Sequence, residues 1–309
     1  MSATELGPSS SGPPEPGESA ASPDQRGQRW SWRLTLGAFA RSRQAQAGLA
    51  VVVLLVLFCF IGPLFYRTNQ ATVHLNLKDA APSARHLLGT DDTGFDVLGR
   101  LMVAGQSSLE LGFAVAIATT VFGTAYGAIA GIAGGIVDAV MMRVVDTLLA
   151  IPWLVLLLIL VNILTPNLWT IIALLTILSW LGVARLVRGE VISLRTREFV
   201  LAARTMGSTT GRIMFRHLIP NAMGVIVVSA TFSIADAILA LSTLSFLGLG
   251  LPPPHADWGS MLTGGLNDLF NGYWWLVYPP AVILIVTIIA FSLIGDALRD
   301  SLDVRLRRR

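Results

Sequence analysis

The segment FVLAARTMGSTTGRIMFRHLIPN, residues 199–221, is basic and helix-prone, and it separates hydrophobic runs that are each long enough to cross a bilayer. At helical spacing Phe199, Ala202, Ala203 and Met206 share one face. Because the two alanines have almost no side-chain bulk, another protein surface can approach this face closely. The segment is therefore predicted to contain a short helix that docks onto a soluble partner.

Turn-forming residues divide the same segment into two helices. Gly207 is a natural C-terminal stop for the first helix. Ser208 can cap a second helix. Pro220 is expected to end that second helix, where the chain turns back into the membrane.

The composition of the chain places most of it in a membrane. Hydrophobic residues make up 53% of the 309 residues and charged residues 13%, whereas soluble domains have about 25% charged residues. The apolar residues gather in runs of about 20, the length that spans hydrocarbon, and helices satisfy all backbone polar groups of such runs internally. The predicted fold class is an all-α polytopic membrane protein.

Six transmembrane helices are expected, at about residues 45–66, 109–132, 144–164, 168–186, 222–249 and 276–294. The other predicted segments are a disordered cytoplasmic tail (1–28), an interfacial amphipathic segment (29–44), an extracytoplasmic connection (67–105), a core with five of the helices (106–296) that contains a cytoplasmic loop (189–221) and an outer loop (250–275), and a basic cytoplasmic tail (297–309). With both termini inside, all but four of the 22 Lys and Arg residues face the cytoplasm, which agrees with the positive-inside rule.

Small residues within the second span indicate close helix packing. Gly123, Gly127 and Gly131 recur every four residues and so share one face. We expect this face to lie against a neighbouring helix.

Two acidic residues follow the turn at Gly134. Asp138 or Asp146 could carry a proton, but Arg143 lies one helical step from each of them. Local neutralisation by Arg143 is the favoured interpretation.

Two polar residues are candidates for the translocation pathway. Asp236 lies well inside the fifth span, and Asn162 lies near the turn after the third. Asp236 either is neutral or bonded to a neighbouring helix, or it lines the pathway and meets a positive group of the substrate. Asn162 could bind substrate, although a hydrogen bond to a neighbouring helix is commoner.

Enzyme chemistry is not indicated anywhere in the chain. No Gly-x4-Gly-Lys-Ser/Thr phosphate loop occurs, so the chain is not expected to hydrolyse ATP itself. We identify no catalytic residue, metal site, cofactor or nucleic-acid partner. Asp91, Asp92 and Asp96 could hint at a cation site, but their spacing matches no complete Ca²⁺ loop and favours a solvated acidic turn.

Residues 199–221 resemble the EAA loop of ABC-importer permeases. Ala202, Ala203, Gly207 and Pro220 fall on that pattern. Two positions depart from it, because Leu201 replaces the family's Glu and His217 its Ile.

Two further stretches resemble the dipeptide, oligopeptide and nickel branch of these permeases. Residues 86–100, HLLGTDDTGFDVLGR, are similar to its signature before the second span, and residues 244–259, LSFLGLGLPPPHADWG, to its outer loop. The resemblance covers about residues 45–307.

The resemblance implies a type I ABC importer permease fold of the C-type subunit in the plasma (inner) membrane. It implies as partners a second, B-type permease, one or two ABC ATPases and an extracytoplasmic substrate-binding protein. The implied ATPase-coupling residues are Phe199, Leu201, Ala202, Ala203, Arg204, Met206, Gly207, Arg212 and Pro220. The implied contacts with the binding protein are Asp91, Asp92, Pro253, Asp257 and Trp258.

The expected function is import of dipeptides or oligopeptides. A permease of the same family for nickel or haem is the alternative. A secondary transporter is a further alternative, which only the mid-membrane position of Asp236 supports.

Overall fold

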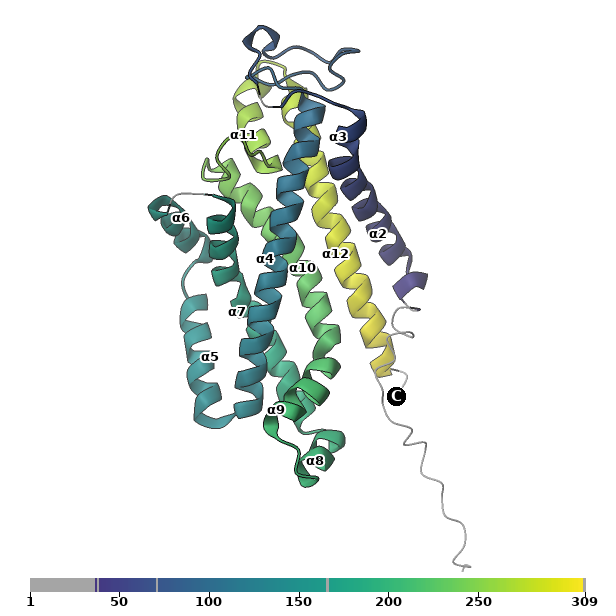
Figure 1. Cartoon of the computed structure of the whole chain (residues 1–309), viewed down its shortest axis with the longest axis vertical. Coiled ribbons are helices and arrows are strands. Elements are labelled where there is room, and N and C mark those ends of the chain that lie inside the picture. The colour runs from purple at the N-terminus through teal and green to yellow at the C-terminus, as the bar shows by residue number, and fades with distance from the viewer. Residues whose placement is uncertain (1–36, 38, 71, 165–166, 308–309) are drawn as a thin grey trace, which may run out of the picture. The chain divides into compact units, whose positions relative to one another are not determined.

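The computed structural model describes residues 37, 39–70, 72–164 and 167–307. Residues Trp32–Arg309 form one compact unit, to which all of the following refers. The predicted tail 1–28 and residues 29–36 and 38 of the predicted amphipathic segment lie outside the described residues. In the described part of the chain the regular structure is helical (Figure 1).

The helices follow one another along the chain, and the connection between α3 and α4 contains only the short turn η2. The long and bundle-forming helices are α2 (Arg43–Val56), α4 (Val97–Ala133), α5 (Gly135–Leu149), α6 (Trp153–Ile163), α7 (Leu168–Arg195), α10 (Ile219–Phe246) and α12 (Tyr278–Arg307). The shorter pieces are η1 (Leu57–Ile61), α3 (Gly62–Phe65), η2 (Leu75–Leu77), α8 (Glu198–Thr205), α9 (Thr210–Ile213), η3 (Met214–Leu218), α11 (Trp258–Leu269) and η4 (Trp274–Leu276).

Among the described residues, five helical stretches are long and apolar enough to cross a membrane. A sixth span results if α5 and α6 are taken together, although the two helices meet at an angle of 80°. The third span, expected at about 144–164, thus corresponds to a bent pair of helices that covers 135–163. Pro152 caps α6 at its N-terminus, and proline cannot continue a helix because it lacks an N–H and clashes with the preceding turn.

Two other expected boundaries differ from the structure. α4 already begins after Asp96, so the extracytoplasmic connection predicted to reach 105 ends nine residues earlier. The predicted tail at 297–309 continues helix α12 as far as Arg307.

Prolines inside two spans are accommodated by wide π-helical turns. Turn η1 precedes Pro63, and turn η3 precedes Pro220. Pro63 has no N–H for the carbonyl of Cys59, and this carbonyl instead accepts a hydrogen bond of 2.7 Å from Gln106 Nε2 on α4. Pro220 lies in the first turn of α10 and therefore does not end a helix, contrary to the prediction.

Helix α4 packs most closely against α7. A Cβ added to Gly123 would lie 2.7 Å from Cβ of Val183, and one added to Gly131 would lie 2.8 Å from Cγ1 of Val191. The predicted packing role of the glycine face is confirmed, because any larger residue would push the two helices apart.

Ion pairs join helix α5 to helix α7. Arg188 donates to both carboxylate oxygens of Asp138, with 2.7 Å from Nη2 to Oδ2. Arg185 pairs with Asp146. The predicted partner Arg143 is thus wrong.

Candidate functional site

The segment 198–218 forms a folded cap on the ends of α7 and α10. Val200 and Ala203 of α8 are buried in one apolar cluster with Ile213 and Leu218. This cluster also includes valines of α7, such as Val191. α8 is therefore fixed to both long helices by its buried face.

A left-handed glycine ends α8. Gly207 has φ of 78°. The N–H of Gly207 donates to the carbonyl of Arg204, and the N–H of Ser208 donates to the carbonyl of Ala203, at 2.9 and 3.0 Å. Thr209, and not Ser208 as predicted, caps the next helix through a hydrogen bond from the N–H of Arg212.

The structure divides the predicted coupling residues between the inside and the outside of this cap. Ala203 is only 2% exposed and packs within the chain, so of the two alanines on the predicted face only Ala202 is open to a partner. Met206 is 78% exposed and Leu201 is 49% exposed. Phe199 is half-buried, with its ring centroid 6.3 Å from that of His217. The remaining predicted coupling residues are exposed: Ala202, Arg204, Gly207, Arg212 and Pro220.

The sequence-based prediction missed two residues of this surface, Phe215 and Arg216. Phe215 in turn η3 is 68% exposed and lies between Arg212 and Arg216 in the sequence. A large apolar residue flanked by arginines outside a span was the signal that could have found it. We call the exposed set Leu201, Met206 and Phe215 with Arg204, Arg212 and Arg216 the coupling surface.

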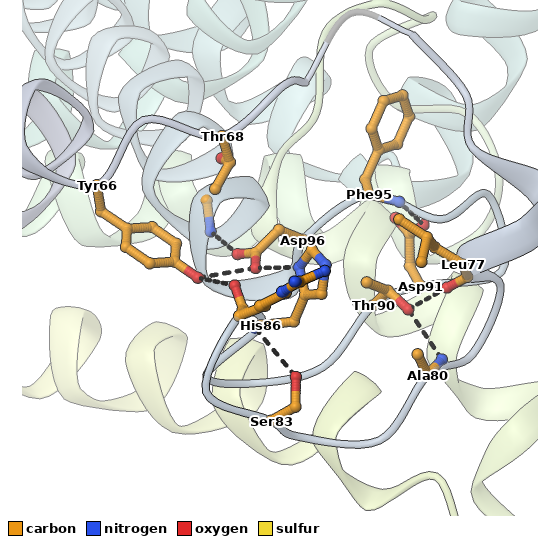
Figure 2. A network of polar contacts seen from close by, with 12 residues as sticks. Tyr66, Thr68, Leu77, Ala80, Ser83, His86, Thr90, Asp91, Phe95 and Asp96 are labelled. Carbon is orange, nitrogen blue, oxygen red and sulfur yellow. Dashed lines mark hydrogen bonds and ion pairs between the residues drawn. The ribbon is translucent and has the colours of Figure 1, made fainter.

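At the opposite end of the bundle, residues 66–70 and 72–96 lie in a loop around Asp96 (Figure 2). The Asp96 carboxylate is buried and caps α4 by accepting a hydrogen bond of 2.8 Å from the N–H of Gly99. Its other oxygen accepts hydrogen bonds of 2.9 Å from the Tyr66 hydroxyl and from His86 Nδ1. Burial, together with the neighbouring Asp96 carboxylate, raises the pKa of Tyr66.

The same loop uses Thr90 and Asp91 as internal hydrogen-bonding groups (Figure 2). The Thr90 hydroxyl accepts from the N–H of Ala80 at 2.8 Å, and Asp91 Oδ1 accepts from the N–H of Phe95 at 2.8 Å. Of the three aspartates expected to form a solvated turn, Asp96 is buried, Asp91 is half-buried and Asp92 is exposed. The described residues contain no group of three His, Cys, Asp or Glu side chains that could hold a metal ion.

A cavity of about 230 Å³ lies where this loop meets the outer loop after α10. Asp91, Asp92 and Arg100 line it from one segment, and Pro253 and His255 line it from the other. The structure therefore brings together three of the predicted outer-face residues that are far apart in sequence. We call this the outer cavity.

Two other predicted outer-face residues are buried, so the predicted contact with a partner is wrong for them. The Trp258 ring is fully buried, and its Nε1 donates to the carbonyl of Leu101 at 3.1 Å. Asp257 caps α11 by accepting from the N–H groups of Gly259 and Ser260, and it also accepts from the Ser245 hydroxyl at 2.8 Å. Burial raises the pKa of Asp257, while these hydrogen bonds act in the opposite direction.

The two candidate pathway residues are both exposed on this chain. Asn162 donates to the carbonyl of Leu158 in its own helix at 2.7 Å, so its amide is engaged locally. Asp236 lies on an exposed face of α10.

The fold and these two ends define the class of the protein as a polytopic helical membrane protein with a folded loop at each end of its bundle. Residues 123–308 match the family described as the binding-protein-dependent transport system inner membrane component. Residues 31–82 match the N-terminal transmembrane domain of oligopeptide transport permease C.

Curated relatives align over most of the chain. The oligopeptide transport system permease protein OppC of Bacillus subtilis is 40% identical over 90% of both chains. The dipeptide transport system permease protein DppC of the same organism is 38% identical over 87% of this chain and 84% of its own. OppC of Escherichia coli K12 is 39% identical over 89% of this chain and 92% of its own.

The chain therefore belongs to the family of inner membrane components of binding-protein-dependent transport systems, in the branch of the permease C subunits. It is an inner membrane transport subunit. Permease subunits of such systems have no ATPase site of their own. A binding protein and an ATPase are implied as partners.

Proposed function

We propose that this chain is one of the two permease subunits of an ATP-driven importer of dipeptides or oligopeptides. The observation that carries the proposal is the identity of 38 to 40% with permeases whose names specify oligopeptide or dipeptide transport, over nearly the whole chain. A second, homologous permease would complete the pathway.

The coupling surface is the proposed docking site for an ABC ATPase. Its apolar members Leu201 and Met206 are exposed outside the candidate spans, and Phe215 is exposed near the start of the candidate span Thr210–Phe246. A free apolar surface outside lipid is favourable only if a partner covers it. The arginines beside them suit a groove with an acidic rim.

Movement of the ATPase can reach the membrane through the buried face of α8. Val200 and Ala203 tie α8 to α7 and to η3. Turn η3 continues into α10 without a break, because Leu218 is followed directly by Ile219. A displacement of α8 is therefore transmitted to the span α10. We infer that ATP binding changes, by this route, the side of the membrane to which the pathway opens.

The outer cavity is the proposed contact for the substrate-binding protein. It combines carboxylates of Asp91 and Asp92 with the guanidinium of Arg100, which lies 4.7 Å above the Phe95 ring. Exposed Pro253 and His255 form its other wall. Charged groups of both signs in a shallow cavity suit a polar protein partner that must bind and leave quickly.

Uptake in a strain that lacks this chain tests the proposal. Loss of uptake of labelled di-alanine and tri-alanine, restored by the wild-type chain, is the expected result. Unchanged peptide uptake together with loss of nickel or haem uptake would assign the chain to the alternative substrates.

A further inference from the structure

Helix α10 carries an acidic residue on its exposed face within the apolar part of its span. Asp236 lies 17 residues after Ile219 and 10 residues before Phe246, the ends of the helix. At a rise of 1.5 Å per residue these intervals are about 25 Å and about 15 Å. Both distances place the carboxylate at the depth of hydrocarbon.

Asp236 has no partner within the described part of this chain. No Lys, Arg or His side chain there forms an ion pair with it. The hydroxyls of Thr231 and Thr243 on the same helix donate to backbone carbonyls of α10 and not to the carboxylate. Whatever stabilises this charge therefore comes from outside the described residues.

The other exposed faces of the spans show what lipid-facing positions look like in this chain. Ile117 and Val121 of α4 and Val282, Ile285 and Ile289 of α12 are all exposed and all apolar. A carboxylate facing lipid costs about 2.5 to 3.5 kcal/mol. The face of α10 with Asp236 is therefore covered by water or by protein.

Three hydroxyl side chains lie along this face of α10, together with the exposed apolar Leu239 between Asp236 and Thr243. Ser229, Ser233 and Thr243 lie seven and three residues before Asp236 and seven residues after it, so the four share one side of the helix. Each of the three hydroxyl residues is partly exposed. A polar stripe through a span is typical of a surface that lines a water-filled path.

We infer that this stripe lines the translocation pathway and that Asp236 favours the passage of substrates with net positive charge. The inference rests on the proposed peptide transport and adds a specificity-determining residue to it. A carboxylate in a narrow aqueous path has weaker screening than one in bulk water, so it attracts a lysine-rich peptide more strongly than a neutral one.

The test compares two peptides in one importer. Uptake of tri-lysine and tri-alanine is measured in the deletion strain that carries either the wild-type chain or Asp236→Asn, which removes the charge but keeps the size. We expect the ratio of tri-lysine to tri-alanine uptake to fall about tenfold, a factor that corresponds to about 1.4 kcal/mol. Asp236→Glu should preserve the ratio, and so should Glu110→Gln, the loss of another exposed acid of a span.

Each other outcome has a definite meaning. An unchanged ratio overturns the inference, whether total uptake stays constant or falls equally for both peptides. If Asp236→Asn prevents co-purification with the second permease, the carboxylate is a subunit contact and the inference is also overturned. If the wild-type chain restores no tri-alanine uptake, the proposed peptide transport itself has failed, which is a distinguishable result.

Discussion

At the residue scale, a buried and an exposed position lie three residues apart at the end of α8. Ala203 is buried in the chain's own apolar cluster, while Met206 is 78% exposed. Helical spacing alone puts both on one predicted face, because it cannot show which part of that face the chain covers itself. The two positions should therefore respond differently to the same substitution.

Ala203→Asp should destabilise the chain, because a carboxylate buried in an apolar cluster costs on the order of several kcal/mol. Met206→Asp should leave the unfolding temperature of the purified chain unchanged but abolish co-purification with the ATPase. Met206→Leu, which keeps an apolar side chain, is the matched control and should retain the ATPase. Normal ATPase binding by Met206→Asp would place the docking surface elsewhere.

Gly207 is constrained by its backbone and not by its surroundings. Its φ is 78°, and no atom lies within 4 Å of an added Cβ. Gly207→Val should therefore impair peptide-stimulated ATP hydrolysis through backbone strain of about 1 to 2 kcal/mol. Gly207→Asn, a residue that tolerates this conformation, should be milder. Equal activities for Val and Asn would show that the left-handed turn is unimportant.

At the element scale, sequence patterns predict local features well and distant partners poorly. The face formed by Gly123, Gly127 and Gly131 is visible in the sequence, because helical periodicity is a local property. The partner of Asp138 is not, because Arg188 lies 50 residues away and only packing of α5 on α7 brings them together. The bend before α6 has a local signal in Pro152 that the hydrophobicity of the run conceals.

The pair Asp138–Arg188 should stabilise the contact between α5 and α7. Its side chains are only 14% and 30% exposed, and two hydrogen bonds join them. Asp138→Ala should lower stability by about 1 to 3 kcal/mol, because Arg188 is left without its partner. Exchanging both residues, Asp138→Arg with Arg188→Asp, should restore part of the loss.

The control for this prediction is Asp146→Ala. The Asp146–Arg185 pair is more than half exposed on both sides, so its loss should have little effect. Thermal unfolding of the purified chain measures all three variants. Equal unfolding temperatures for Asp138→Ala and the wild type would contradict the assigned role.

The loop around Asp96 should lose its order when the carboxylate is removed. Asp96→Ala deletes a helix cap worth about 1 kcal/mol, removes the acceptor of His86 and leaves the Tyr66 hydroxyl with only the carbonyl of Arg85. Trypsin should then cut faster after Lys78 and Arg85, because cleavage requires local opening of the loop. Asp92→Ala, which removes an exposed carboxylate of the same loop, should leave the cleavage rate unchanged. Equal rates for Asp96→Ala and the wild type would mean that the loop is held by other contacts.

At the scale of the whole molecule, the span α10 joins the two functional ends. Its first turn follows the coupling surface, and the loop after its last turn leads to the outer cavity. The resemblance of three separate stretches predicts the family, which the comparisons confirm, and family membership removes the secondary-transporter alternative. The sequence does not reveal the outer cavity, because two loops more than 150 residues apart form it.

The central claim is that the coupling surface and the outer cavity lie on opposite sides of the membrane. Single cysteines at Thr210 and His255, both exposed, test it directly with a membrane-impermeant thiol reagent in intact cells. The one native cysteine, Cys59, is fully buried and should stay unlabelled. We expect His255→Cys to react and Thr210→Cys to be protected. Labelling of Thr210→Cys in intact cells would contradict the orientation, and with it the docking of an ATPase at this surface.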